Sequence, residues 1–305
     1  MNSLSAHLEA ELEQRFDVVR WFELSPAEQA AWLKDHASSV RAVIAGGNVG
    51  CSNALMEALP SLGVIALNGV GLDKVDLQLA RSRGVRVTTT PGALTDDVAD
   101  LAVGLIVSLL RSIPAGDVYV RSEQWGKEER PLGRQVSGRR FGIVGLGAIG
   151  SAIAARLVAF GAVAYTGPRR KPAPYAFHPD VIELARVSDV LVIACSANAS
   201  TRHLINPAAL AALGPQGFLV NVSRGSVVDE TALIAALNDG GIAGAALDVF
   251  ENEPHVPEAL RASPKVVLTP HIASATVEGR ARMAAMVLEN LDAFLAGTPL
   301  PTAVA

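Results

Sequence analysis

The sequence predicts an α/β protein of two domains with parallel sheets, and three observations support that fold class. Short apolar segments alternate with helical segments along most of the chain, which is the pattern of strands that pair in parallel. A glycine-rich motif of the kind that binds dinucleotides, GLGAIG, begins at Gly145. Because this motif stands near the middle of the chain, a first α/β unit must precede it as a separate domain.

The first hundred residues predict one series of strands and helices. The expected strands are 40–45, 64–68 and 85–88, and the expected helices are 51–59 and 76–83. The first two strands each end in a glycine-rich turn, Gly46-Gly47-Asn48 and Gly69-Val70-Gly71. A long helix rich in Ala, Leu and Val is expected at 98–112, with Thr95 or Asp96 as its N-cap.

The glycine motif opens the second series of elements. The expected strands are 141–144, 162–165, 190–194, 218–222, 244–247 and 266–268, and an Ala-rich helix at 151–160 follows the motif. The Pro-rich stretch 171–179 is expected to form a surface loop. The last helix, 277–295, has apolar residues at helical spacing and is expected to return to the first unit. We therefore predict two domains. Residues 1–97 and 275–305 form the substrate or catalytic domain, and residues 98–274 form the NADP-binding domain.

The composition of the chain disfavours a nucleic-acid-binding protein, a membrane protein and a secreted protein. Half of the 305 residues are hydrophobic, and the net charge of −4 predicts no attraction to nucleic acid or to an anionic membrane. The longest apolar runs, such as 101–110, are too short to span a bilayer. Cys51 and Cys195 are expected to be reduced thiols of a cytoplasmic protein, since the N-terminal segment lacks the basic and apolar parts of a signal peptide. We assign no metal site.

The glycine motif predicts a site for the pyrophosphate of a dinucleotide. Gly145 permits the tight turn, Gly147 lets the backbone approach the phosphates, and Gly150 lets the helix pack on the strand. The phosphates would lie at the helix N-terminus, where free N–H groups favour anions, so the site includes Ala148 and Ile149. A plain glycine-rich turn is the alternative, and the succession of strand, turn, helix and strand disfavours it.

Basic residues follow the second strand of this series, at the place where NAD-dependent enzymes carry an acid. The strand is followed by Arg169 and Arg170, and no Asp or Glu occurs between the motif and Asp180. An acid would bind the ribose 2′-hydroxyl and repel a 2′-phosphate, whereas guanidinium groups bind phosphate. The sequence therefore favours NADPH over NADH, with a solvated basic loop as the alternative interpretation.

Five motifs in a fixed order extend from Asn68 towards the C-terminus. They are NGVGLD (68–73), GLGAIG (145–150), NVSRGSVVDE (221–230), LDVFENEP (247–254) and LTPHIAS (268–274). In these motifs the chain resembles the D-isomer-specific 2-hydroxyacid dehydrogenases. In 95–100 and 167–172 it is similar to the branch that contains NADPH-dependent glyoxylate/hydroxypyruvate and hydroxyphenylpyruvate reductases.

The resemblance implies a fold and an assembly. The fold would be two Rossmann-like domains: a discontinuous, flavodoxin-like substrate domain and an inserted NAD(P)-binding domain. The active site would lie in the cleft between the domains, and the protein would form a homodimer. One loop departs from the family, because Cys195-Ser196-Ala197 stands where the family usually carries a Pro-Leu or Pro-Thr pair.

Three residues at the ends of expected strands match the family's motifs and have the chemistry that a 2-oxoacid reductase requires. Arg224 can bind a carboxylate through its planar guanidinium, although a surface ion pair with a neighbouring acid would also account for it. His271 can protonate the developing alkoxide as an imidazolium. Glu253 can orient the imidazole and favour its protonated form, with Glu251 as the alternative partner.

Further contacts are expected around these residues. The backbone N–H groups of Val70 and Gly71 can form an anion site for the substrate carboxylate, with a plain turn as the alternative. The family match assigns Asp248 to the nicotinamide carboxamide, unless it is a turn cap, and places Cys195 and Val222 beside the cofactor. Residues that could line the pocket for the substrate side chain are Asn48, Val49 and, from a partner subunit, Trp125.

The sequence thus predicts an oxidoreductase, an NADPH-dependent 2-oxoacid reductase with glyoxylate and hydroxypyruvate as substrates. Larger 2-oxoacids such as hydroxyphenylpyruvate are the alternative substrates. A non-catalytic NAD(P)-sensing protein on the same fold, like the dehydrogenase-related transcriptional co-repressors, is the alternative of another class. A formate dehydrogenase is disfavoured, because that family lacks the glutamate partner of the histidine.

Overall fold

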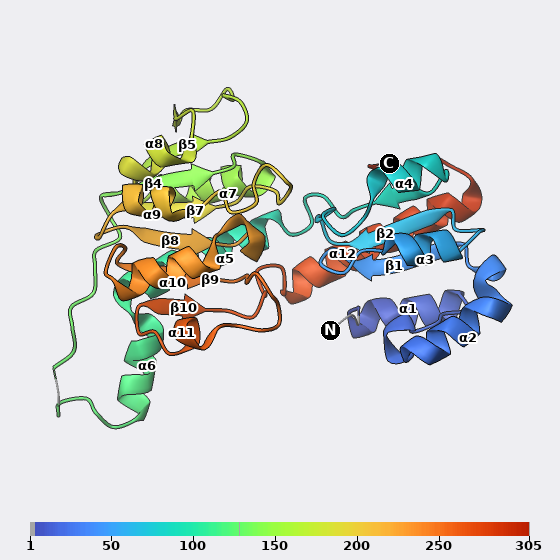
Figure 1. The fold of residues 1–305 in the computed structure, drawn as a ribbon, viewed down its shortest axis with the longest axis horizontal. Coiled ribbons are helices and arrows are strands. Elements are labelled where there is room, and N and C mark those ends of the chain that lie inside the picture. The colour runs from blue at the N-terminus through green and yellow to red at the C-terminus, as the bar shows by residue number, and fades with distance from the viewer. Residues whose placement is uncertain (1–3, 128, 305) are drawn as a thin grey trace. The chain divides into compact units, whose positions relative to one another are not determined.

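The computed structural model describes residues 4–127 and 129–304, which fold into two compact units. One unit comprises Met1–Leu94 and Ala275–Ala305, and the other comprises Thr95–Ser274 (Figure 1). In both units the strands pair in parallel and helices lie between them in the sequence. The predicted α/β fold class is therefore confirmed.

The first unit contains a three-stranded parallel sheet in the order β1-β2-β3. The strands are β1 (Ala42–Gly46), β2 (Val64–Asn68) and β3 (Arg86–Thr88), and the helices are α1 (Ala6–Arg15), α2 (Pro26–His36), α3 (Asn53–Ala58), α4 (Leu77–Ser82) and α12 (Val277–Ala296). Every residue of the central strand β2 is buried. Its Val64 and Ala66 pack with Leu8 of α1 and Leu291 of α12, so the last helix of the chain completes the core of the first unit.

The second unit contains a seven-stranded parallel sheet in the order β10-β9-β8-β7-β4-β5-β6. The strands are β4 (Arg139–Val144), β5 (Gly161–Thr166), β6 (Ala176–Phe177), β7 (Val190–Ile193), β8 (Phe218–Asn221), β9 (Gly244–Leu247) and β10 (Val266–Leu268). The chain begins at β4, builds outwards to β6, and then returns to place β7 on the other side of β4. The strand order reverses at this point, and in open α/β sheets ligands bind at the carboxyl ends of the strands beside such a reversal.

Helices cover this sheet because its strands are apolar on both faces. They are α5 (Thr95–Arg111), α6 (Ile113–Arg121), α7 (Ala148–Leu157), α8 (Val181–Arg186), α9 (Pro207–Leu213), α10 (Glu230–Asn238) and α11 (Glu258–Arg261). Leu184, Leu210 and Leu233, from α8, α9 and α10, form one core with buried residues of β7, β8 and β9. Helix α5 packs against α7 and against β8, β9 and β10.

No single helix in the described part of the chain is long and apolar enough to cross a membrane. Only α5 and α6 taken together reach the necessary length and composition, and the chain bends by 61° between them.

Three expectations need correction. Thr95 and Asp96 do not cap the long helix, because α5 already begins at Thr95; Asp96 instead pairs with Arg156 of α7 at 2.9 Å. The helix after the glycine motif begins at Ala148, inside the motif, rather than at 151. The Pro-rich stretch 171–179 is not only loop, because it contains the short edge strand β6, which pairs with β5. The remaining expected strands agree with the structure to within two residues.

Candidate active site

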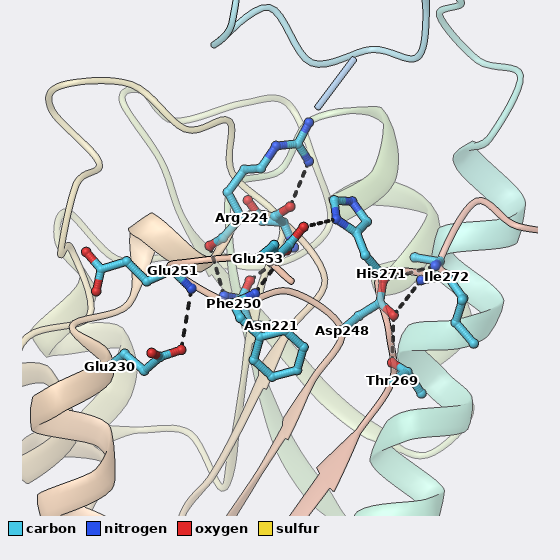
Figure 2. Close-up of polar contacts among 12 residues, drawn as sticks. Asn221, Arg224, Glu230, Asp248, Phe250, Glu251, Glu253, Thr269, His271 and Ile272 are labelled. Carbon is cyan, nitrogen blue, oxygen red and sulfur yellow. Dashed lines mark hydrogen bonds and ion pairs between the residues drawn. The ribbon is translucent and has the colours of Figure 1, made fainter. Parts of the chain in front are cut away.

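Three loops at one edge of the larger sheet bring together the predicted polar side chains. Arg224 follows β8, Glu253 follows β9, and His271 follows β10. These strands are parallel neighbours, so their carboxyl ends meet at the same edge. Figure 2 shows the Glu253 carboxylate facing the His271 ring, with Arg224 on the adjacent loop.

The closest polar contact in this group joins His271 and Glu253. The ring Nδ1 lies 2.7 Å from Oε2 of Glu253, and the other carboxylate oxygen accepts a 3.0 Å hydrogen bond from the backbone N–H of Phe250. With both oxygens engaged, the carboxylate is held in one orientation. The ring is then oriented through Nδ1, which leaves Nε2 as the nitrogen able to exchange a proton with a ligand.

The electrostatic environment keeps Glu253 ionised. Burial is the largest single influence and by itself would raise the pKa of this carboxyl group. The hydrogen bonds from His271 and from the Phe250 N–H, with the charges of His271 and Arg224, outweigh burial and hold the pKa of Glu253 below its usual value. An ionised carboxylate at Nδ1 can accept a hydrogen bond from the ring N–H, which orients the imidazole.

Glu251, the alternative partner for the histidine, lies elsewhere. Its Oε1 is 3.0 Å from Arg202 Nη2 and 2.8 Å from His203 Nε2. Figure 2 shows Glu251 extending away from His271. The geometry therefore sets Glu253, and not Glu251, against the imidazole.

A buried carboxylate fixes the turn that carries His271. The side chain of Asp248 is fully buried and accepts hydrogen bonds from Thr269 Oγ1 at 2.6 Å and from the N–H groups of Ile272 and Ala273, both at 2.9 Å. Its carbonyl accepts from the N–H of His271 at 2.8 Å. His271 adopts a left-handed backbone conformation, with φ of 55°, which these bonds hold in place.

Asp248 therefore caps the turn that carries His271, which is the alternative role that the sequence left open for it. Its three hydrogen bonds already occupy both carboxylate oxygens. An assignment to the nicotinamide carboxamide therefore stays a prediction.

The loop that carries Arg224 is fixed by Asn221, a residue whose role the sequence did not indicate. Asn221 is fully buried; its Oδ1 accepts from the Ser223 N–H, and its Nδ2 donates to the carbonyl of Arg224, both at 3.0 Å. Gly225 lies so close to the loop after β9 that a Cβ would come within 1.9 Å of the Phe250 carbonyl carbon. A buried amide at the last position of a strand is the signal that could have identified Asn221.

The three glycines of the motif each meet a different constraint. Gly145 has φ of 93°, and a Cβ there would lie 2.6 Å from Cα of Cys195. A Cβ on Gly150 would lie 2.0 Å from the carbonyl oxygen of Gly145. A Cβ on Gly147 would meet no atom within 4 Å, so this glycine leaves open space in front of the helix.

The N-terminus of α7 has the properties that a dinucleotide pyrophosphate requires. Gly147 is the N-cap of α7, and it supplies no side chain to the N–H groups of the first turn. These groups, on Ala148 and Ile149, have no intrahelical acceptor. Cys195 lies against the glycine turn, and burial raises the pKa of its thiol to about 11, so it stays neutral. Val222 is buried directly after β8.

Arg169 and Arg170 lie on the loop that follows β5, beside the glycine motif in the sheet. Strands β4 and β5 are paired over their whole length, so the glycine turn and the basic loop emerge from adjacent strands. Both arginines are exposed, and within residues 4–127 and 129–304 neither makes a side-chain hydrogen bond or ion pair. The two guanidinium groups therefore remain available for an anion such as a 2′-phosphate.

The first unit holds the predicted residues of the two glycine-rich turns. The turn that contains Val70 and Gly71 lies against the turn after β1, where a Cβ on Gly47 would be 3.3 Å from the Gly71 nitrogen. Asn48 and Val49 are exposed on that second turn. An anion site at these turns stays a prediction.

Comparisons with known proteins agree on one family. Residues 103–273 match the NAD binding domain of the D-isomer specific 2-hydroxyacid dehydrogenases. Glyoxylate/hydroxypyruvate reductase A of Arabidopsis thaliana is 47% identical over 306 residues, which cover 100% of this chain and 97% of the relative. Hydroxyphenylpyruvate reductase of Plectranthus scutellarioides is also 47% identical, with the same coverage of both chains.

A solved structure is similar over nearly the whole chain. It is an NADPH-dependent glyoxylate/hydroxypyruvate reductase of Sinorhizobium meliloti, in complex with NADP and malonate. The two chains superpose with a TM-score of 0.91 at 39% identity, covering 99% of this chain and 94% of the other.

The lowered pKa of Glu253 predicts a pH-dependent contribution to stability. The folded state lowers the pKa, so the ionised carboxylate stabilises the fold above the usual carboxyl pKa, and this stabilisation disappears as the pH falls through the lowered value. Glu253→Gln should therefore cost stability at pH 7 and progressively less as the medium is acidified. Denaturant unfolding of the wild type and of Glu253→Gln, at a series of pH values from 7 downwards, measures the difference in their free energies of unfolding.

Glu289→Gln, which changes an exposed carboxylate of α12, is the matched control and should show no comparable pH dependence. A difference between wild type and Glu253→Gln that stays constant with pH would contradict the assignment.

Proposed function

Because the chain belongs to the D-isomer specific 2-hydroxyacid dehydrogenase family, we propose that it is an NADPH-dependent reductase of small 2-oxoacids. The chain is an oxidoreductase that uses a nicotinamide cofactor. The observation that carries the finer proposal is the contact between His271 and Glu253, on the loops that follow β10 and β9, with Arg224 on the loop that follows β8. Glyoxylate and hydroxypyruvate are the proposed substrates, in line with the relative from Arabidopsis thaliana.

Each of the three residues has one part in the reaction. Arg224 binds the carboxylate of the 2-oxoacid through its guanidinium and draws electron density towards the carbonyl oxygen. The bound nicotinamide supplies the hydride. His271 donates the proton from Nε2 to the developing alkoxide, so that a 2-hydroxyacid and a neutral imidazole result. Glu253 holds the ring at Nδ1 and favours the imidazolium before transfer.

We assign the remaining predicted residues to binding. We assign the N–H groups of Val70 and Gly71 to binding of the substrate carboxylate. The N-terminus of α7 would hold the cofactor pyrophosphate, and Arg169 and Arg170 would hold the 2′-phosphate. Cys195 and Val222 would contact the cofactor, and Asp248 would receive the nicotinamide carboxamide.

Larger 2-oxoacids are the second candidate substrates. Hydroxyphenylpyruvate reductase is as similar to this chain as the glyoxylate/hydroxypyruvate reductase is, at 47% identity. A non-catalytic NAD(P)-sensing protein is not favoured, since an oriented and ionised Glu253 behind His271 serves proton transfer and has no use in sensing alone.

We further propose that the protein is a cytoplasmic homodimer whose interface includes α6. The exposed fractions of Val118, Val120 and Trp125, on and after this helix, are 64%, 54% and 79%, so this segment exposes large apolar side chains that a protein interface would bury. A monomer in light scattering at micromolar concentration would contradict the dimer. The two free cysteines are consistent with a reducing compartment, and recovery outside the cytoplasm on cell fractionation would contradict that location.

Replacing the proposed acid should remove catalysis without removing the cofactor. His271→Ala should lower kcat/KM for 2-oxoacid reduction by about 10²–10⁴-fold, because proton transfer loses its donor. The affinity for NADPH should stay near that of wild type. Steady-state kinetics and a binding titration measure the two effects, and His7→Ala on the exposed face of α1 is the control. Near-normal turnover would overturn the assignment of His271.

Replacing the two arginines should reveal the preferred cofactor. Arg169→Ala with Arg170→Ala should weaken NADPH binding by about 1.5–3 kcal/mol for each charge-assisted hydrogen bond that the phosphate no longer accepts, and should leave NADH binding almost unchanged. Arg186→Ala removes an exposed arginine of α8 and should change neither affinity. Equal weakening of NADPH and NADH binding would refute a phosphate-binding role for the pair.

A further inference from the structure

The basic loop, residues 167–171 between β5 and β6, is closed at its base by one phenol hydroxyl. Tyr165, near the end of β5, accepts a hydrogen bond from the N–H of Lys171 at 2.7 Å and donates one to the carbonyl of the same residue at 3.0 Å. The tyrosine is 1% exposed, and its ring packs against Phe177 of β6 at 5.3 Å between centroids. The hydroxyl therefore fixes the end of the loop to a rigid part of the sheet.

The side chain of Lys171 connects the same loop to the glycine turn. Its Nζ donates to the carbonyl of Leu146 at 2.5 Å, and Leu146 is a buried residue between Gly145 and Gly147 of the motif. On the other side of the loop, the N–H of Gly145 donates to the carbonyl of Thr166 at 2.9 Å. The basic loop and the glycine turn are thus bonded at both ends of the loop.

Prolines restrict the backbone on both sides of the two arginines. Arg169 and Arg170 stand between Pro168 and Lys171, and Pro172 follows directly. Each proline fixes its own φ and restricts the residue before it, so Gly167 and Lys171 are restricted as well. Holding a charged side chain near its binding position before the ligand arrives lowers the entropic cost of binding.

From this arrangement we propose that Tyr165 and Lys171 are positioning residues that set the preference for a 2′-phosphorylated adenosine. The hydroxyl and the ammonium hold the backbone from which the two guanidinium groups extend at a fixed place relative to the glycine turn. A single ligand would present its 2′-phosphate to the basic loop and its 5′-phosphate to the glycine turn. The distance between the loop and the turn therefore decides whether the two phosphates can be bound at the same time. The ammonium donates to the carbonyl of Leu146, so we assign Lys171 to holding the loop against the glycine turn.

The inference rests on the proposed NADPH preference, and its test uses fragments of the cofactor that need no turnover. Adenosine 2′,5′-bisphosphate carries both phosphates, and adenosine 5′-monophosphate lacks the 2′-phosphate. Calorimetric titration of the full chain gives the dissociation constant of each. Tyr165→Phe keeps the buried ring and removes only the hydroxyl.

Tyr165→Phe should raise the dissociation constant of the bisphosphate by about three- to tenfold, the change expected when a neutral hydrogen bond is removed, and should change that of the monophosphate by less than about twofold. Tyr175→Phe is the matched control, because the hydroxyl of Tyr175 makes no hydrogen bond in the part of the chain that the structure describes. It should change neither constant.

A combined variant tests whether Tyr165 acts through the arginines. In a chain that already carries Arg169→Ala and Arg170→Ala, Tyr165→Phe should have no further effect on bisphosphate binding. An equal weakening in both backgrounds would overturn the positioning role. If Tyr165→Phe does not fold, Lys171→Met is the second variant, because it removes the bond from Lys171 to the Leu146 carbonyl. It should lower the preference for the bisphosphate over the monophosphate. An unchanged preference would overturn the proposal.

The outcomes separate this inference from the proposed function. Wild-type protein that binds the two fragments equally would refute the NADPH preference itself, and the inference with it. Wild-type protein that prefers the bisphosphate, with a Tyr165→Phe variant that keeps the whole preference, would refute the inference and leave the proposed function standing. Faster cleavage of unliganded Tyr165→Phe by trypsin after Arg169 or Arg170 would support a loosened loop.

Discussion

The carboxylate of Asp248 is fully buried at the end of β9, and the turn that carries His271 is bonded to both of its oxygens. A buried carboxylate requires hydrogen bonds to replace water, and Asp248 obtains them from Thr269, Ile272 and Ala273. In return it holds His271 in a left-handed conformation that costs backbone energy. The imidazole is thus placed before any ligand binds, which is how an active site avoids reorganisation during the reaction.

The same edge of the sheet carries the residues proposed for proton transfer and those proposed for cofactor binding. Asn221 bonds the backbone of the Arg224 loop, and its carbonyl also accepts from the N–H of Asp248, so the loops after β8 and β9 share one network. The glycine turn and the basic loop follow β4 and β5, on the other side of the reversal in strand order. One parallel sheet therefore supplies the proposed acid, its carboxylate partner, a guanidinium and the proposed phosphate-binding turn from a single edge.

Most of the fold could be predicted from the sequence, because apolar periodicity and glycine position are local signals. Strands such as β2 and β9 are predicted to the residue. The start of α5 was missed because Asp96 forms an ion pair with Arg156, sixty residues away in the sequence, rather than capping the helix. The strand β6 was missed because it is two residues long and surrounded by prolines, so only pairing with β5 defines it.

Some residues of the site could likewise be predicted from the sequence, and others could not. Arg224, Glu253 and His271 could be proposed because their types and motifs indicate their chemistry. The supporting residues could not, because Asn221, Tyr165 and the turn-holding part of Asp248 depend on hydrogen bonds that only the folded chain forms. The choice of Glu253 over Glu251 likewise rests on a distance, 2.7 Å from Oε2 to the His271 ring, that spacing alone does not determine.

The proposed activity is tested most directly by measuring kcat/KM for a panel of 2-oxoacids, each with NADPH and with NADH. We expect the highest values for glyoxylate or hydroxypyruvate with NADPH, and lower values for the same acids with NADH. Comparable efficiency with NADH, or no turnover of any 2-oxoacid, would contradict it.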